Sequence, residues 1–191
     1  TPSAPRSARS SRALICLPEY EVLRHPARIG LVADTHLMMQ RPLPPALLDG
    51  LATCDIIFHA GDILRPWVLE RLDAIAPTYA VYGNGDEDEP ELMRTLPFER
   101  YFRCGEHRIG LIHGHHHAGR SRMTAREYAY DRMRGVVDWA VYGHSHRPLI
   151  EQRNGLWMMN PGSPTQPRWA PGPTWGVLEI GERIQARLID L

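Results

Sequence analysis

The sequence predicts an α/β fold in which two β-sheets pack against each other. Short apolar strands alternate with helices from residue 28 to about Pro77, and this alternation is typical of a parallel sheet. The rest of the chain is rich in strand and hairpin signals, so we expect it to form a second sheet packed on the first. Hydrophobic residues make up 43% of the 191-residue chain, which is enough for the core that this arrangement requires.

The N-terminal segment differs in composition from the rest of the chain. Residues 1–12 contain Ser, Arg, Pro and Ala without apolar periodicity, which favours a disordered tail. The apolar run at residues 14–17 is a candidate edge strand. We therefore divide the chain into a disordered or loosely attached segment, residues 1–26, and a single domain, residues 27–191.

Three strand–helix pairs are expected in the first half. Each predicted helix has Pro at or near its first position, where the missing N–H costs no hydrogen bond. In the second of these helices, Val68, Leu69, Leu72 and Ile75 recur at the spacing of one helix face. The predicted strands cover residues 29–33, 55–60 and 78–82, and the predicted helices cover residues 44–51, 66–75 and 90–96.

Strands dominate the second half. Two runs, residues 100–104 and 108–112, flank Gly105-Glu106-His107, which is a hairpin signal. The Pro- and Gly-rich segment at residues 161–173 is interpreted as a loop, because a strand pair still follows it. The remaining predicted elements are a helix at residues 124–134 and strands at residues 139–142, 148–152, 156–160, 175–180 and 183–191.

Composition excludes several classes of chemistry. All 22 basic residues are Arg, so a Schiff-base lysine, a P-loop lysine and a kinase lysine are impossible. The 22 acidic residues balance them, and a formal net charge of zero argues against nucleic acid as a partner. No apolar run approaches the roughly 20 residues of a membrane-spanning helix, so we expect no membrane partner. Scattered cysteines at Cys16, Cys54 and Cys104, without CxxC spacing, favour the reducing cytoplasm.

Asp, Asn and His residues follow the ends of most predicted strands. Ligands of open sheets bind there, because loops that are distant in the sequence meet beyond the carboxyl ends of the strands. Asp, Asn and His offer oxygen and nitrogen ligands to divalent metals, and no Cys lies nearby, which favours an open, catalytic metal site. The five motifs are Asp34-Thr35-His36, Gly61-Asp62, Gly83-Asn84-Gly85-Asp86, His113-Gly114-His115 and Gly143-His144-Ser145-His146.

Taken singly, these motifs have ordinary explanations. Gly-Asp and Gly-Asn-Gly are common turn sequences, and an Asp after a strand often caps a helix. Asp34 and His36, like His144 and His146, are two residues apart, so an extended backbone would direct each pair to one side. Five such motifs in this order favour one joint metal site over five unrelated turns.

In this order the motifs resemble those of the calcineurin-like metallophosphoesterases, and most of all their small bacterial and archaeal branch, the YfcE-like phosphodiesterases. The resemblance extends from about Arg28 to the C-terminus and includes Asn160-Pro161-Gly162-Ser163. It implies a four-layer α/β/β/α sandwich with a dinuclear metal site. It also implies hydrolysis of a small phosphate ester, most of all a phosphodiester, by a metal-bridging hydroxide.

The resemblance further implies a function for each site residue. Asp62, Asn84 and His115 would take part in catalysis, with His115 in contact with the phosphate. The cofactor would be two divalent cations, with Mn as first choice and Fe, Zn, Ni or Co as alternatives. One cation would take Asp34, His36, Asp62 and His146, and the other would take the bridging Asp62 together with Asn84, His113 and His144.

One position departs from the family pattern. Many relatives have His directly after the motif Asn, where it can protonate the leaving group, but this chain has Gly85. His115 is the first substitute, and His59, His116 and His117 are weaker ones. The motif loops show no Lys and no obvious Arg, which predicts a preference for diesters, since a monoester dianion needs additional cationic contacts.

Two other functions are open. The retromer subunit with this fold is a non-catalytic scaffold that has lost part of its metal site, whereas every ligand position is filled here. A nuclease is a second alternative, although the neutral charge and the lack of Lys oppose it. The sequence is also compatible with a homo-oligomer.

Overall fold

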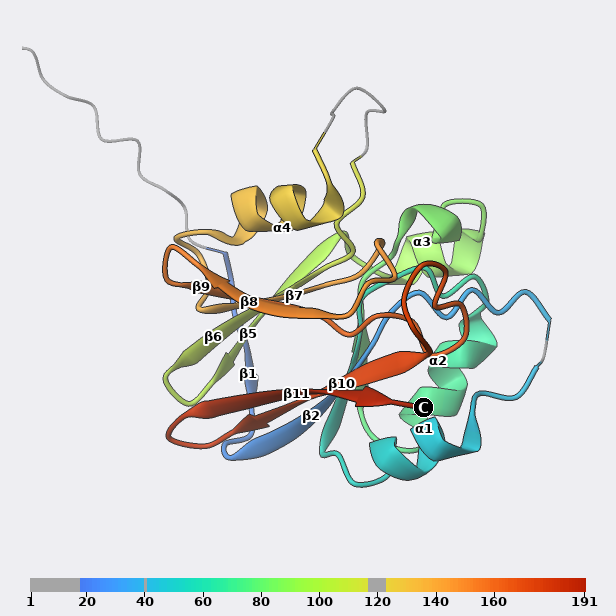
Figure 1. The fold of residues 1–191 in the computed structure, drawn as a ribbon, viewed down its shortest axis with the longest axis horizontal. Coiled ribbons are helices and arrows are strands. Elements are labelled where there is room, and N and C mark those ends of the chain that lie inside the picture. The colour runs from blue at the N-terminus through green and yellow to red at the C-terminus, as the bar shows by residue number, and fades with distance from the viewer. Residues whose placement is uncertain (1–17, 40, 117–122) are drawn as a thin grey trace, which may run out of the picture.

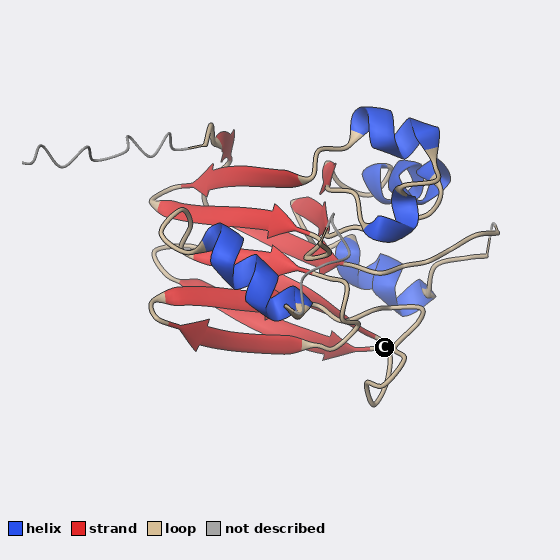
Figure 2. Ribbon diagram, turned by 90° about the horizontal axis from the view of Figure 1, so that it is seen from above, coloured by secondary structure: helices blue, strands red, loops and turns tan. Residues whose placement is uncertain are grey.

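The computed structural model describes residues 18–39, 41–116 and 123–191, and the candidate strand at residues 14–17 lies outside these ranges. The described chain forms two mixed β-sheets that face each other, with helices on both outer faces (Figures 1 and 2). The first sheet has the strand order β11-β10-β2-β3-β4, and the second has the order β1-β5-β6-β7-β9-β8. This arrangement is the expected four-layer α/β/β/α sandwich.

The first sheet combines three strands of the first half with a C-terminal hairpin. β2 (Ala27–Val32), β3 (Ile56–His59) and β4 (Thr78–Ala80) run parallel, as their alternation with helices predicts. β10 (Thr174–Ile180) pairs antiparallel with β2, and β11 (Ile184–Asp190) pairs antiparallel with β10. The expectation that the later strands all build the second sheet is therefore wrong for this hairpin, which the preceding loop carries back to the first sheet.

The second sheet comes mainly from the strand-rich half. β5 and β6 form the predicted hairpin, but His107 pairs with Cys104, so the turn contains only Gly105 and Glu106. An additional edge strand, β1 (Glu21–Leu23), pairs parallel with β5; three residues are too few to show the alternation that would predict it. The other strands are β5 (Glu99–Cys104), β6 (His107–Ile112), β7 (Trp139–Tyr142), β8 (Leu149–Arg153) and β9 (Leu156–Asn160).

Helices cover the outer face of each sheet (Figure 2). Against the first sheet, α1 (Pro45–Leu51), α2 (Pro66–Asp73) and α3 (Pro90–Thr95) all begin with Pro and bury apolar side chains. α4 (Ala125–Met133) packs on the second sheet, and its N-cap Thr124 forms a capping box with Glu127. Among the described residues, no helix combines the length and the apolar character needed to span a membrane.

The main core lies between the two sheets. Ile29 and Leu31 of β2 face it, whereas Val32 packs toward the helices of the first sheet, as strand alternation requires. Phe58 of β3 stacks on Phe102 of β5, with ring centroids 4.4 Å apart. This packing holds the sheets face to face, so the loops that follow β2, β3, β6 and β7 meet at one edge.

Candidate metal centre

Six of the seven predicted metal ligands lie together at this edge. β2 and β3 of the first sheet lead into three of them, and β6 and β7 of the second sheet lead into the other three. They form two groups, and within each group the ligand atoms lie within 4.8 Å of one another. One group is Asp34, His36 and His146, and the other is Asp62, His113 and His144.

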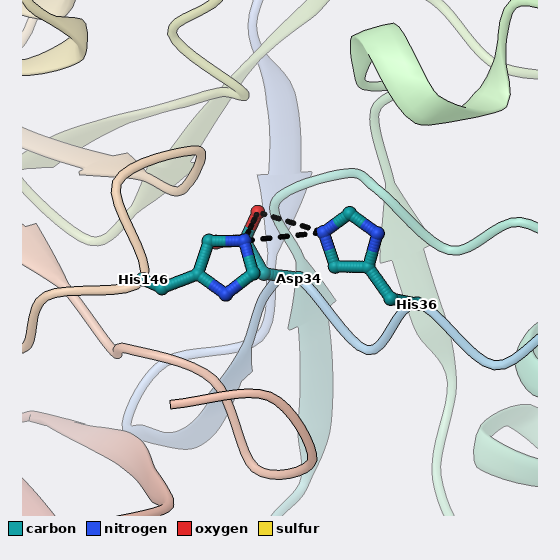
Figure 3. A group of neighbouring side chains, drawn as sticks. All are labelled: Asp34, His36 and His146. Carbon is teal, nitrogen blue, oxygen red and sulfur yellow. Dashed lines mark hydrogen bonds and ion pairs between the residues drawn. The ribbon is translucent and has the colours of Figure 1, made fainter. Parts of the chain in front are cut away.

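The three side chains of the first group direct their ligand atoms toward one another, as a site for one cation requires (Figure 3). Nε2 of His36 lies 3.1 Å from Nε2 of His146 and 3.9 Å from Oδ1 of Asp34. Nε2 of His146 lies 3.5 Å from the same carboxylate oxygen. Two imidazole nitrogens and one carboxylate oxygen therefore face one another across a few ångströms.

Asp62, a member of the second group, also faces the first group. Its Oδ2 is 3.2 Å from Nε2 of His36 in the first group, and its Oδ1 is 3.3 Å from Nε2 of His113 in the second. Nδ1 of His144 lies 3.2 Å from Nε2 of His113 and completes the second group. A single carboxylate thus presents one oxygen to each group, as a bridging ligand would have to.

Backbone carbonyls orient two of the imidazoles. Nδ1 of His113 lies 2.7 Å from the carbonyl oxygen of Ala60, and Nδ1 of His146 lies 2.5 Å from that of Gln166. A carbonyl can only accept, so each Nδ1 donates, and the neutral ring keeps its lone pair on Nε2. These lone pairs point at carboxylate oxygens and other imidazoles, which is repulsive unless a positive charge lies among them.

The protonation of the site supports the same conclusion. Burial raises the pKa of Asp34 to about 7, and Oδ2 of this carboxylate has no hydrogen-bond partner within the described chain. Burial opposes a charge on His113, but the hydrogen bond with Asp62 outweighs it and raises the pKa of His113 to about 9. Without a cation, a proton therefore lies between Nε2 of His113 and Oδ1 of Asp62. The residues fit divalent cations, which would bind the same oxygen and nitrogen atoms.

Five of the six grouped residues have a left-handed backbone, which residues other than glycine rarely adopt. Such conformations cost on the order of 1–3 kcal/mol each and persist only where the surrounding structure enforces them. The extended backbone expected for the two His-containing pairs is therefore wrong, since left-handed residues turn both members of each pair toward the site. The φ angles are 54° at Asp34, 45° at His36, 57° at Asp62, 66° at His144 and 57° at His146.

The buried carboxylate of Asp86 anchors the loop that carries Asp62. Its Oδ1 accepts hydrogen bonds from the N–H groups of Ile63 (2.8 Å) and Leu64 (2.7 Å), and its Oδ2 accepts from those of Asp62 (3.0 Å) and Gly83 (2.8 Å). Four donors on one carboxylate hold the left-handed turn in place. The motif showed an acid at this position, but its anchoring function depends on contacts with a distant loop that no sequence pattern displays.

We expect Asp86→Asn to lower the free energy of unfolding of the metal-free protein by about 2–4 kcal/mol, because an amide NH2 would face two N–H donors. Urea unfolding in EDTA measures this without a contribution from bound metal. Asp73→Asn is the matched control, since Oδ1 of Asp73 accepts one exposed hydrogen bond from the N–H of Thr78, and we expect a loss below about 1 kcal/mol. Equal losses in the two variants would contradict the anchoring function.

The end of β9 and the loop that follows it connect the ligand-bearing loops. Oγ of Ser163 donates to the carbonyl oxygen of Asp34 at 2.7 Å. Nδ2 of Asn160 donates to the carbonyl oxygen of Gly143, next to His144, at 2.8 Å. The Asn-Pro-Gly-Ser sequence of this chain therefore positions loops from both sheets.

Asn84, the seventh predicted ligand, lies at the rim of the site. It begins a short 3₁₀ helix (Asn84–Asp86) and is exposed. The next residue, Gly85, donates its N–H to Oδ1 of Asp62 at 2.7 Å, which places Asn84 beside the second group.

The histidines considered as proton donors have different surroundings. His115 is only 3% exposed, and its ring centroid lies 5.3 Å from that of His113. Burial lowers the pKa of His59 to about 3, so this fully buried residue is neutral. His116 packs on an aromatic ring of α4, and His117 lies outside the described residues.

An arginine that the motifs did not indicate lies close to the first group. Arg168 follows Gln166 by two residues, and the carbonyl oxygen of Gln166 contacts His146. Burial has the largest influence on the pKa of Asp34, and the charge of Arg168 acts on this pKa as well. Arg168 belongs to a loop that carries no ligand, so the expectation that the motif loops contain no obvious Arg did not indicate it.

Comparisons with known proteins bear on the chemistry of this centre. A family model described as the calcineurin-like phosphoesterase superfamily domain matches residues 28–183. A probable metallophosphoesterase of Methanothermobacter thermautotrophicus is 34% identical over 163 residues, which are 84% of this chain and 91% of that protein. Phosphodiesterase YfcE of Escherichia coli is 28% identical over 116 residues, which are 59% of this chain and 58% of that protein.

A solved structure has the same fold. Vacuolar Protein Sorting 29 of Cryptosporidium parvum superposes with a TM-score of 0.71 over 86% of this chain and 91% of that chain. The two sequences are 23% identical, so the likeness is one of architecture.

Proposed function

This chain belongs to the calcineurin-like phosphoesterase superfamily, and we propose that it is a phosphodiesterase that acts with two bound divalent cations. The strongest support is the position of Asp62, which offers one oxygen to each of two groups of ligand atoms. We assign Asp34, His36, Asp62 and His146 to one cation and Asp62, Asn84, His113 and His144 to the other.

Bound cations would lower the pKa of a water molecule so that it can attack phosphorus, and would neutralise charge on the phosphate oxygens. The residues of the chain hold the reactants. The exposed amide of Asn84 is available to a phosphate oxygen beside Asp62. We assign to His115 a contact with phosphate at the floor of the site, because its ring lies next to that of His113.

The substrate, the metal and the cellular location each have separate support. We propose that the substrate is a small phosphate ester, more narrowly a phosphodiester, because the related YfcE is named a phosphodiesterase. We propose Mn as the resident metal, since oxygen and imidazole ligands without thiolate suit it, while Fe, Zn, Ni or Co would fit the same ligands. Free, buried thiols at Cys54 and Cys104 agree with a cytoplasmic location.

Removal of metal tests the proposed function. We expect EDTA, followed by gel filtration, to lower the hydrolysis of bis(p-nitrophenyl) phosphate by on the order of 10³-fold or more, and Mn to restore it. We expect the loss because, without a cation, the site can neither activate a water molecule nor neutralise charge on the phosphate oxygens. Circular dichroism before and after the treatment is the control for folding. Full activity in protein shown by elemental analysis to be free of metal would refute the dinuclear mechanism.

A non-catalytic scaffold is the competing function. The fold shared with Vacuolar Protein Sorting 29 does not by itself imply catalysis. A scaffold would bind metal without hydrolysing any ester, so the same experiment distinguishes the two functions. The five left-handed residues around the ligand groups favour the enzyme, because strain of this kind clusters at functional sites.

A further inference from the structure

A hollow of about 600 Å³ lies beside the metal centre and has no part in the chemistry proposed above. Ser145, which separates the ligands His144 and His146, is in its wall. Arg168 and Trp169 form another part of the wall. The loop that carries them is held against His146 through the carbonyl oxygen of Gln166. A molecule whose phosphate lies at the metal centre could therefore extend directly into this hollow.

The wall of the hollow is positively charged. Its lining includes Arg126, Arg147 and Arg168 but no acidic residue. Nε and Nη2 of Arg126 each donate to one carboxylate oxygen of Glu151, and Glu151 does not line the hollow. Within the described part of the chain, Arg147 and Arg168 have no carboxylate within 4.0 Å. Two guanidinium groups are thus available to an anion.

Arg168 is held in a conformation that its sequence does not favour. Its φ is 50°, in the left-handed region, although it is not a glycine. Gln166, two residues earlier in the same loop, contacts His146 through its carbonyl oxygen, and Ser145 lies in the same wall as Arg168. Arg168 therefore lies near the metal centre while it lines the hollow.

Trp169 presents a flat apolar surface next to these charges. It is 84% exposed, the highest value among the exposed large hydrophobic residues of the described chain. Aromatic side chains in this position stack planar rings, and a stacked base is worth about tenfold or more in affinity. A hollow with an exposed indole and two unpaired guanidinium groups matches a ligand that is both aromatic and anionic.

We infer that the hollow binds the part of the substrate that is not attacked, and that this part is a nucleotide: a planar heteroaromatic ring with a further phosphate. The inference rests on the proposed function for the position of the reacting phosphate. In the reaction, the oxygen of water forms a bond to phosphorus while the bond from phosphorus to the leaving oxygen breaks. One proton of the water goes to that oxygen to give the alcohol, and the other stays on the phosphomonoester.

Nucleotide binding can be measured without catalysis. We expect ADP to quench tryptophan fluorescence of the full chain, both with Mn and in EDTA, and adenosine to bind at least about tenfold more weakly than ADP. Arg168→Gln should weaken ADP binding about tenfold, whereas Arg71→Gln, an exposed arginine on α2, should leave it unchanged. Trp169→Phe should abolish the fluorescence change. Equal affinity in the two arginine variants, or quenching that persists in Trp169→Phe, would overturn the inference.

A pair of substrates tests the same subsite during turnover. Thymidine 5′-(p-nitrophenyl phosphate) and methyl p-nitrophenyl phosphate share a leaving group and differ only in the group that is retained. We expect KM to be about tenfold lower for the nucleoside ester at similar kcat, Trp169→Ala to remove the difference and Trp169→Phe to keep it. Equal KM values in the unmodified protein would refute the subsite while leaving the phosphodiesterase intact. Absence of hydrolysis of both esters would refute the proposed function, and the ADP titration would still decide on the hollow.

Discussion

Asp62→Ala is expected to remove both metal ions and to lower kcat for a bis-aryl phosphate by on the order of 10³-fold or more. The reason is geometric: Oδ1 and Oδ2 of Asp62 lie 3.3 Å and 3.2 Å from imidazole nitrogens of different ligand groups. Without this carboxylate, His36 and His113 lose the negative charge that they share. Elemental analysis of the purified variant should show both cations depleted.

His36→Ala is the matched control, because His36 belongs to one group only. We expect it to reduce the occupancy of one cation and to retain the other. Asp62→Asn keeps the size of the side chain and an acceptor for the N–H of Gly85, so it separates loss of charge from collapse of the loop. An Asp62→Ala protein that still holds two cations per chain would assign the bridge to another residue.

A steep dependence on the leaving group is the second large effect that we expect. Gly85 stands where many relatives have a proton-donating His, and general acid catalysis supplies about 10²–10⁴-fold. Aryl diesters should therefore react fast and alkyl diesters slowly. The measurement is kcat/KM across phosphodiesters of graded leaving-group pKa. A flat dependence in a chemistry-limited regime would reveal another acid, and His115, with Nε2 3.5 Å from Oε1 of Glu87, is the first residue to replace.

Gly85→His should recover part of the rate on poor leaving groups. Gly85 does not have a positive φ, so the obstacle is crowding: a Cβ there would lie 2.8 Å from Cδ2 of Leu64 and 3.0 Å from Oδ1 of Asp62. The Leu64 side chain is flexible and can move, whereas the Asp62 contact must relax by a few tenths of an ångström. Gly85→Ala measures the cost of crowding without an imidazole. Equal rates for the Ala and His variants on alkyl esters would show that an acid at this position does not help.

The elements that have a local apolar pattern could be predicted from the sequence. β7, Trp139–Tyr142, and β9, Leu156–Asn160, have the predicted bounds, because compact apolar runs end at polar motif residues. The pairing of β10 with β2 could not be predicted, since it joins residues about 150 positions apart and alternation does not name a partner. The three residues of β1 were too few to show any pattern.

The residues of the candidate site could likewise be predicted only in part. Asp34, Asp62 and His113 each follow a strand, so strand ends were enough to bring them into one prediction. Asp86 and Arg168 act through contacts that depend on the folded loops. Asp86 lies in a motif but accepts hydrogen bonds from another loop, and Arg168 belongs to a segment that the sequence marks only as rich in Pro and Gly.

Selection of variants by heat resistance alone should drive this protein toward inactivity. Gly tolerates the left-handed backbone that Asp34, His36 and His146 adopt, so replacing these ligands with Gly would relieve conformational energy in the metal-free chain. Melting temperature and turnover would then change in opposite directions along such a series. Engineering for robustness is better directed at the helical faces that cover the first sheet, where backbone geometry and catalysis do not compete.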